Sequence, residues 1–264
     1  MTSYSLLRET AEYDRLRAQA RIWETATARL LDRIALPAGA RCLDVGCGPG
    51  ETVRLLARRV GPAGHVTGLD SDPALVEVVA SDLRSENCDI LLGDITRDLI
   101  PGRYDLVFAR LLLFHLPQRV EVVRRLWDAV APGGHLVIQD YDLTSACCVP
   151  AAPGVDEVAA LVIESFTAAG CDVRAGLRLS TFLKEAGVGT PDGTDVSGLL
   201  VPLSQGGVML GQVLRSLLPS AIANGVTTRD KAEAALARLT DDAAGDPDRP
   251  MLWPLMAGIW KTRP

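Results

Sequence analysis

The sequence predicts an α/β protein whose core is a doubly wound parallel sheet. Two observations predict it. Short apolar segments alternate with helical segments over about 100 residues, which is the pattern of βαβ units. The polar residues that stand out come directly after those apolar segments, where open parallel sheets bind their ligands. With 264 residues, 48% of them hydrophobic and 23% charged, the chain can bury a full core without disulfides or metals.

The alternation begins after an amphipathic N-terminal helix. Apolar residues recur on one face of that helix over residues 16–34, and Pro37-Ala-Gly39 ends it. Further along, Asp72 or Ser71 is placed to cap a helix that begins at Pro73. The expected strands are residues 41–45, 65–70, 89–94, 104–109 and 135–140. The expected helices between them are residues 52–60, 73–83 and 120–130.

After Tyr141 the pattern becomes mostly helical. Pro219 is expected to kink or end the helix that contains it, and Thr227, three residues before Asp230, is expected to cap the next helix. Residues 241–250 indicate a polar loop. The expected helices are residues 155–169, 177–186, 209–223 and 230–239, and the expected strands are residues 194–201 and 255–260. Since no convincing linker precedes this half, we interpret it as the end of the same sheet with helical insertions.

Composition and charge exclude several classes of protein. The net charge of −6 opposes a surface that coats nucleic-acid phosphates. No apolar run approaches the roughly 18 residues that span a bilayer. The charged N-terminus leaves no signal-peptide core, so we expect a soluble, cytoplasmic protein. The six cysteines form no C-x-x-C pair and the three histidines lie far apart, which predicts reduced thiols and no metal site.

A glycine-rich turn follows the first strand, in the segment Leu43-Asp-Val-Gly-Cys-Gly-Pro-Gly-Glu51. Gly46, Gly48 and Gly50, with Cys47 among them, let a ligand approach the backbone closely. A dinucleotide fingerprint needs Gly or Ala where this chain has Glu51, and the carboxylate of Asp44 would repel a pyrophosphate. A ligand that carries an ammonium group fits this turn better.

Two further acids end the next two strands. Asp70 comes 26 residues after Asp44 and can accept two hydrogen bonds from a ribose diol, with Ser71 beside it. Asp94, in Gly93-Asp-Ile95, can accept from an adenine amino group while the Ile95 N–H is offered to a ring nitrogen. Each acid alone is also expected as a helix cap or loop residue. Three of them at successive strand ends beside one glycine turn indicate a nucleoside site.

These residues resemble the class I S-adenosylmethionine-dependent methyltransferases. The matching motifs are Asp44-x-Gly46-x-Gly48-x-Gly50, Asp70, Asp94, Tyr104-Asp-Leu-Val107 and Ala131-Pro-Gly-Gly134. The resemblance covers residues 15–145 and is nearest to small-molecule enzymes of quinone biosynthesis and bacterial secondary metabolism. It implies a Rossmann-like sheet of seven strands with helices on both faces, whose last two strands are residues 194–201 and 255–261. Residues 145–250 match none of its motifs.

The resemblance also implies how the chain divides. Residues 1–36 would be an N-terminal helical lid, and residues 37–264 the methyltransferase domain, with substrate-cap insertions at residues 145–192 and 203–250. Asp44 and the backbone of residues 46–50 would hold the methionine portion of S-adenosylmethionine. Asp70 would hold the ribose, and Asp94 and Ile95 the adenine. The backbone at Ala109 and Arg110 would pass near the ammonium and sulfur, and the product would be S-adenosylhomocysteine.

Methyl transfer to a hydroxyl, amine or acidic carbon is helped by a general base. The candidate catalytic residues at the ends of the fourth and fifth strands are His115, Arg110, Asp140 and Tyr141. His115 can titrate near neutrality, but a structural or cofactor-lid histidine is the favoured interpretation. Arg110 is always charged, so it would anchor a substrate carboxylate or neutralise Asp140. Asp140-Tyr-Asp142 resembles part of the acid cluster of Mg²⁺-dependent O-methyltransferases; the Asp-Asn pair of that pattern is missing, so no metal is expected.

The N-terminal helix and the insertions are expected to set specificity. Residues 208–222 are strongly apolar, as in the core of a lid or in the wall of a pocket for an apolar substrate. Trp23, Phe166, Phe182 and Trp253 are candidates to join them.

Two other functions stay open. The acidic charge opposes an RNA or protein methyltransferase, as does Ala109-Arg-Leu-Leu112 where an Asn-Pro-Pro-Tyr-type motif would stand. A protein of this fold that binds S-adenosylmethionine but catalyses a non-methylating step, such as cyclisation, is compatible with every motif. The expected partner is a small-molecule substrate, without nucleic acid or membrane, and a homodimer is compatible with the sequence.

Overall fold

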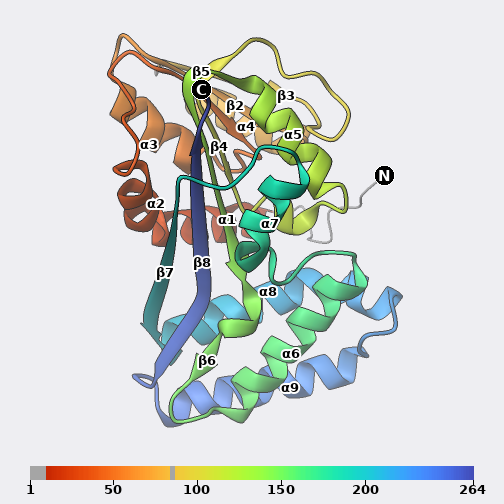
Figure 1. The fold of residues 1–264 in the computed structure, drawn as a ribbon. Helices are drawn as coiled ribbons and strands as arrows, with labels where there is room; N and C mark the ends of the chain where they lie inside the picture. The colour runs from red at the N-terminus through yellow and green to blue at the C-terminus, as the bar shows by residue number, and fades with distance from the viewer. Residues whose placement is uncertain (1–9, 84–86) are drawn as a thin grey trace.

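The computed structural model describes residues 10–83 and 87–264. It confirms the predicted α/β class. A sheet with helices on both sides forms the upper part of the molecule in Figure 1, and a second group of helices lies at the end toward which β5 runs.

One mixed sheet of eight strands organises the described part of the chain. The first five strands are parallel, and β8 pairs antiparallel with β5 on one side and β7 on the other. The order is β3-β2-β1-β4-β5-β8, and the two-residue β6 pairs with the start of β8. The strands are β1 (Arg41–Val45), β2 (His65–Asp70), β3 (Cys88–Leu92), β4 (Tyr104–Arg110), β5 (Val130–Asp142), β6 (Cys147–Cys148), β7 (Gly193–Pro202) and β8 (Pro250–Thr262). The order reverses between β1 and β4, which brings their carboxyl ends together at the switch point.

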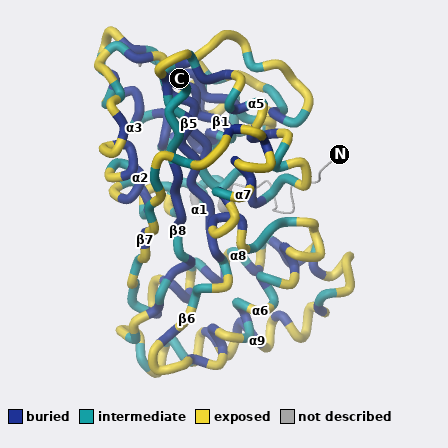
Figure 2. Tube along the Cα trace, in the orientation of Figure 1, coloured by how far each residue is buried: buried dark blue, intermediate teal, exposed yellow. Residues whose placement is uncertain are grey.

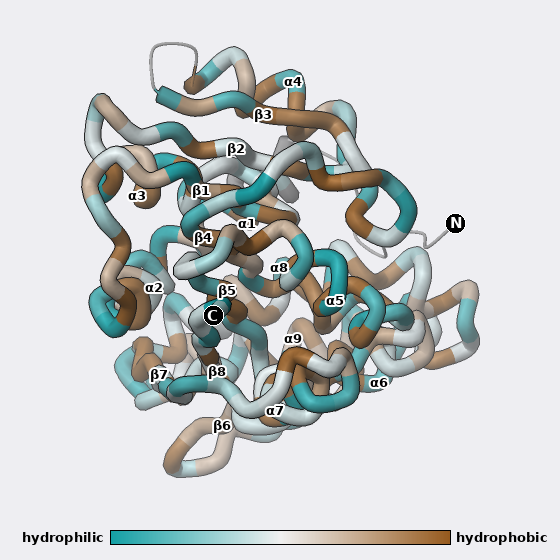
Figure 3. The backbone as a smooth tube through the Cα atoms, turned by 45° about the horizontal axis from the view of Figure 1, so that its top comes forward, coloured by the Kyte–Doolittle hydropathy of each residue, from teal (hydrophilic) through white to brown (hydrophobic). Residues whose placement is uncertain are grey.

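Alternating side chains along each strand form two apolar layers. In β4, Leu106 and Phe108 pack with α2, α3 and α4, whereas Val107 and Ala109 pack with α5 and α7. Figure 2 shows the strands of this core as buried. At the edge, β3 is hydrophobic in its second half (Figure 3), and Leu92 there is 59% exposed. The helices of this part are α1 (Thr10–Ile22), α2 (Glu24–Leu31), α3 (Glu51–Val60), α4 (Pro73–Asp82), α5 (Arg119–Ala129) and α7 (Ala175–Glu185).

Three helices form the second layer: α6 (Pro153–Ala168), α8 (Leu203–Ala223) and α9 (Arg229–Gly245). Figure 1 shows them packed together below the sheet. The apolar core is continuous from Val45 and Ala109 in the sheet to Phe166 and Leu214 in these helices. We call this group the cap helices. None of the helices in the described ranges is long and apolar enough to cross a membrane.

Several expectations about element ends were wrong. The N-terminal helix is two helices that meet at Trp23. Helix α8 continues through Pro219 to Ala223, because packing of a long apolar face outweighs the loss of one helical hydrogen bond. Thr228, not Thr227, caps α9, and its hydroxyl accepts from Lys231 N. The expected loop at residues 241–250 is helical as far as Gly245. The N-cap at Asp72 is confirmed: its carboxylate accepts from Ala74 N.

Candidate functional site

A cavity of about 880 Å³ lies between the carboxyl ends of the strands and the cap helices. Its size is within the usual range for small-molecule sites. One wall is the glycine turn with the ends of β2 and β3: Gly46, Cys47, Gly48, Asp70, Ser71, Gly93, Asp94 and Ile95. The opposite wall comes from α1, α6, α8 and β8 and is mainly apolar, with Leu16, Val162, Ile163, Phe166, Leu210, Val213 and Trp253. The cavity therefore joins the predicted nucleoside site to the predicted substrate side.

The glycine turn is held close to β2 by its own backbone. The Gly46 and Cys47 N–H groups both donate to Leu69 O, at 2.8 and 3.1 Å. Gly48 has φ +50°, and a Cβ built there meets no protein atom within 4 Å. Gly50 has φ +77°, and a Cβ there would lie 2.5 Å from Val79 Cγ1. Packing explains Gly50, whereas Gly48 leaves open space over the backbone that a ligand can fill.

Asp70 fixes the turn and keeps capacity for a ligand. Its Oδ2 accepts from Gly48 N at 2.8 Å and its Oδ1 accepts from Asp72 N at 3.0 Å. Burial raises the pKa of Asp70, and these backbone hydrogen bonds oppose the rise. An ionised carboxylate offers about four lone-pair sites, so capacity remains for a hydroxyl group beside the backbone N–H groups of Gly48, Ser71 and Asp72.

Asp94 lies in the loop after β3, two residues beyond the last residue of the strand, Leu92. Its Oδ1 accepts from Thr96 N and Thr96 Oγ1, at 2.9 and 2.7 Å. Partial burial raises the pKa of Asp94, but these bonds and the nearby Arg97 lower it further, so it lies below its ordinary value. The carboxylate is thus ionised at neutral pH, with Ile95 beside it in the cavity wall.

Asp44 is 2% exposed, and its Oδ2 has no hydrogen-bond partner among the described groups. Burial raises the pKa of Asp44 to about 7, while the positive charge of Arg110 lowers it. Arg110 itself lines the cavity, and its Nη1 donates to Thr27 Oγ1 at 3.0 Å. Thr27 in turn donates to Gln139 Oε1 at 2.7 Å. Asp44 and Arg110 thus influence each other electrostatically without forming a direct ion pair.

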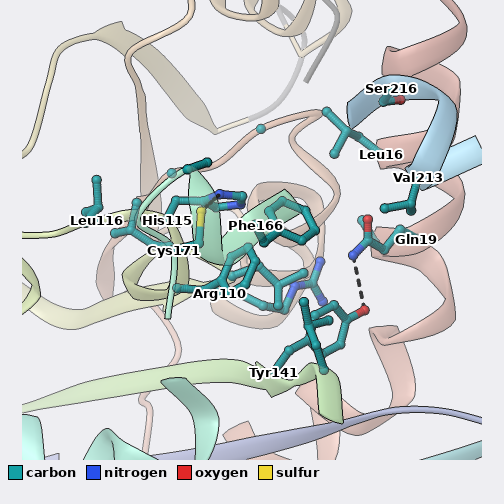
Figure 4. A pocket seen from close by; sticks show the side chains of 18 of the residues that line it. Leu16, Gln19, Arg110, His115, Leu116, Tyr141, Phe166, Cys171, Val213 and Ser216 are labelled. Carbon is teal, nitrogen blue, oxygen red and sulfur yellow. Dashed lines mark hydrogen bonds between the residues drawn. The ribbon is translucent and has the colours of Figure 1, made fainter. Parts of the chain in front are cut away.

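Tyr141 lies where the two walls meet. Its hydroxyl accepts from Trp23 Nε1 at 2.6 Å, Gln19 Nε2 at 3.1 Å and Trp253 Nε1 at 3.3 Å. In Figure 4, Gln19 and Arg110 point toward this hydroxyl from different elements. Burial raises the pKa of Tyr141, although the three donors and Arg110 act against the rise. The ring is therefore a neutral phenol near pH 7, held by residues from α1, β8 and the α1–α2 junction.

His115 lies on the cavity wall after β4, in the short 3₁₀ helix η1 (Leu113–His115). It packs edge-on against Phe114 and Phe166, with ring centroids 4.5 and 6.1 Å apart, and its Nδ1 is 4.0 Å from Cys171 Sγ. Burial raises the pKa of Cys171 to about 11, so this thiol is neutral. The imidazole of His115 therefore forms part of the cavity wall (Figure 4).

Asp140, a candidate catalytic residue from the sequence, does not lie in the cavity wall. It is fully buried. Its Oδ2 accepts from Phe114 N and its Oδ1 from Tyr141 N, both at 2.9 Å. Burial raises the pKa of Asp140 to about 7, and its backbone hydrogen bonds oppose the rise. Asp140 therefore fixes η1 relative to β5 and has no path to a ligand.

Sequence reasoning missed several wall residues. Gln19 and Cys171 carried no motif, and only contacts between distant segments bring them to the cavity. Phe166 and Trp253 line the cavity as expected, whereas Trp23 and Phe182 are buried behind it. The described residues contain no cluster of three or more His, Cys, Asp or Glu that could hold a metal ion.

Comparisons with known proteins agree on one family. Residues 43–138, from β1 to β5, match the family model described as a methyltransferase domain. Trans-aconitate 2-methyltransferase of Rhizobium rhizogenes is 38% identical over 113 residues, which is 43% of this chain and 43% of that protein. Methyltransferase GfsG of Streptomyces halstedii is 28% identical over 220 residues, 79% of this chain and 73% of that protein. The alignment thus spans under half the length of the first relative.

The fold comparison extends over more of the chain. A crystal structure of a Bacillus halodurans protein, named as a candidate methyltransferase, superimposes with a TM-score of 0.62. The match covers 90% of this chain and 98% of that one, at 15% sequence identity. A sequence identity of 15% supports similarity of fold alone. The sheet and the cap helices together therefore follow a known arrangement.

Proposed function

We propose that this chain, whose residues 43–138 match a methyltransferase domain model, is a class I S-adenosylmethionine-dependent methyltransferase that transfers a methyl group to an O, N or C atom of a small, mainly apolar molecule. One observation carries the proposal. A single cavity has the glycine turn and the acidic strand ends on one wall and the apolar cap helices on the other. Such a cavity can hold a polar cofactor and an apolar acceptor in contact with each other.

The residues of the first wall fit S-adenosylmethionine. Asp44 does not itself line the cavity but directly precedes the lining residue Val45, and its unpartnered oxygen would complement an ammonium group, since a buried carboxylate without a partner is costly. The free lone pairs of Asp70 suit a ribose diol, and Asp94 with Ile95 N–H suits the adenine edge. Gly48 leaves the space for close approach, and Cys47, Ser71, Gly93 and Arg110 complete the wall. Ala109, a candidate from the sequence, is fully buried in β4 and does not line the cavity. When bound, the cofactor supplies a methyl group already activated by a sulfonium.

The protein's own contribution is to position the reactants and keep water away from them. Helix α1 closes one side of the cavity, and Arg17 Nε on this helix lies 3.0 Å from Glu51 Oε1 at the start of α3. We assign residues 10–36, the described part of the predicted segment 1–36, to a lid, and the segments near residues 145–192 and 203–250 to a substrate cap. Their apolar side chains select an apolar acceptor.

His115 is the proposed general base where the acceptor carries a proton. It lies in the cavity wall among Phe114, Phe166 and Cys171, and imidazole can take a proton near neutral pH. Arg110 and Tyr141 orient the acceptor from the other side. Asp140 acts through η1, which carries His115, and is a positioning residue.

Native mass spectrometry of the purified protein, with and without added S-adenosylmethionine, tests the cofactor. A mass increment of S-adenosylmethionine or S-adenosylhomocysteine supports the proposal. Asp70→Ala is the matched variant and should lose the increment at the same concentration. No increment at saturating cofactor would refute it.

Release of S-adenosylhomocysteine during turnover separates methyl transfer from a non-methylating reaction. Turnover of an acceptor without that release would move the function to a step such as cyclisation. Retention on heparin that salt weakens would instead favour an RNA substrate.

A further inference from the structure

The cavity contains one cation that forms no direct ion pair with a carboxylate of the described residues. Arg110 is the only Lys or Arg among its described lining residues. None of the ion pairs within 4.0 Å in the described part of the chain includes Arg110. Its guanidinium donates to the neutral Thr27 hydroxyl. A guanidinium has five donors in a planar fork, so most of its capacity is left for a ligand.

Tyr141 offers a second donor at the same place. An indole N–H can only donate, and both Trp23 Nε1 and Trp253 Nε1 point at the phenol oxygen. The amide of Gln19 lies 3.1 Å from the same oxygen and can accept as well as donate, so an acceptor in the cavity competes with Gln19 for the hydroxyl hydrogen. Bonds accepted by the oxygen also polarise the hydroxyl and make it a better donor.

The surroundings select the charge of the ligand. A charged group in an apolar cavity is costly unless it is paired. Glu51, Asp70 and Asp94 also line this cavity, and they oppose an anion with several charges. A carboxylate carries a single charge and matches the guanidinium fork with two parallel hydrogen bonds.

We propose that Arg110 and Tyr141 form a carboxylate-binding site inside the cavity. Two sources supply this chemistry if the chain is the methyltransferase proposed above: the α-carboxylate of the cofactor and an acidic group on the substrate. In the first case, Asp44 and Arg110 together take a zwitterionic amino-acid group. In the second case, the substrate class is an apolar acid.

Calorimetry with two pairs of probes tests the site. The first pair is S-adenosylhomocysteine and its decarboxylated analogue, which has hydrogen in place of the carboxylate. The second pair is 4-phenylbutanoate and its amide, titrated into protein loaded with S-adenosylhomocysteine. The proteins are the wild type, Arg110→Gln, Tyr141→Phe and the control Arg58→Gln, whose arginine lies on the exposed face of α3 against Glu24. Melting temperatures check that each variant is folded.

The wild type should prefer the carboxylate member of one pair by about 10- to 100-fold, the range for hydrogen bonds to a charged group. Preference within the first pair assigns the site to the cofactor, and preference within the second assigns it to the substrate. Arg110→Gln should abolish the preference, Tyr141→Phe should reduce it, and Arg58→Gln should retain it.

The wild-type comparison decides the matter even if Arg110→Gln does not fold. A wild type that binds S-adenosylhomocysteine but prefers neither carboxylate would overturn this inference and leave the methyltransferase proposal intact. A wild type that binds neither adenosyl probe would instead refute the proposed function. Preference that persists in folded Arg110→Gln and Tyr141→Phe would place the carboxylate elsewhere.

Discussion

Replacing Asp44 with asparagine should stabilise the protein at neutral pH while weakening cofactor binding. The pKa of Asp44 is raised from 3.8 to about 7, chiefly by burial. The folded state therefore holds a proton that the unfolded state has lost between these two pH values. Stability from this group is fully present below pH 3.8 and is lost as the pH rises through about 7. At 1.36 kcal/mol per pKa unit, the loss is about 4 kcal/mol by pH 8.

Asp44→Asn removes this titration and keeps the shape of the side chain. We expect the variant to unfold with about the same free energy as the wild type at pH 4.5 and to be about 2–4 kcal/mol more stable at pH 8, by urea titration at each pH. Asp140→Asn is the control, because Asp140 also has a pKa raised to about 7 but accepts from backbone N–H groups. That variant should be destabilised. Parallel pH profiles for the wild type and Asp44→Asn would refute the reasoning.

Cofactor binding gives a second measurement of the same charge. An ammonium group beside Asp44 lowers its pKa, so binding at pH 7 should release about half a proton. Calorimetry of S-adenosylhomocysteine in buffers of different ionisation enthalpy measures this release. Asp44→Asn should release none from this position and bind about 10- to 100-fold more weakly.

Three further variants test separate parts of the structure. Asp70→Ala should weaken S-adenosylhomocysteine binding by about 10- to 100-fold in calorimetry, since Gly48 N and the ribose both lose an acceptor; equal affinity would remove the ribose assignment. His115→Gln should lower turnover of a proton-bearing acceptor by about 10²- to 10⁴-fold with unchanged cofactor affinity; an unchanged rate would leave His115 as wall only. Leu214→Ala empties a fully buried position in α8 and should cost about 2–5 kcal/mol in urea unfolding; a cost near zero would mean that the cap is not packed as described.

Local patterns predicted the cofactor half of the fold well. The strands at residues 41–45 and 65–70 have the predicted bounds, because short apolar runs that end in a glycine turn or an acid have few other solutions. The glycine turn after the first strand and Asp70 at the end of the second meet at one cavity, because parallel strands share one carboxyl edge. Asp94 was expected at the end of its strand but follows it by two residues, a difference that periodicity cannot resolve.

The contacts between distant segments could not be predicted. Asp140 and Tyr141 were equal candidates in sequence, yet one is turned under η1 and the other faces the cavity. Successive side chains of β5 point to opposite faces of the sheet, so Asp140 and Tyr141 lie on different faces. The sequence does not tell which of these faces is turned toward the cap helices. The series of hydrogen bonds from Arg110 to Thr27 and from Thr27 to Gln139 joins three elements. No motif marks such a network, because each member is ordinary by itself.

The place of β8 has a consequence for synthesis of the protein. This strand is the last of the described elements to leave the ribosome, yet it pairs with β5 from His135 to Asp142 and with β7 on its other side. Until it emerges, β5 presents an unpaired apolar edge that includes Val137 and Ile138, and such edges recruit strands from other chains. The nascent cofactor half is therefore expected to be the aggregation-prone stage, until β8 has emerged and paired with β5.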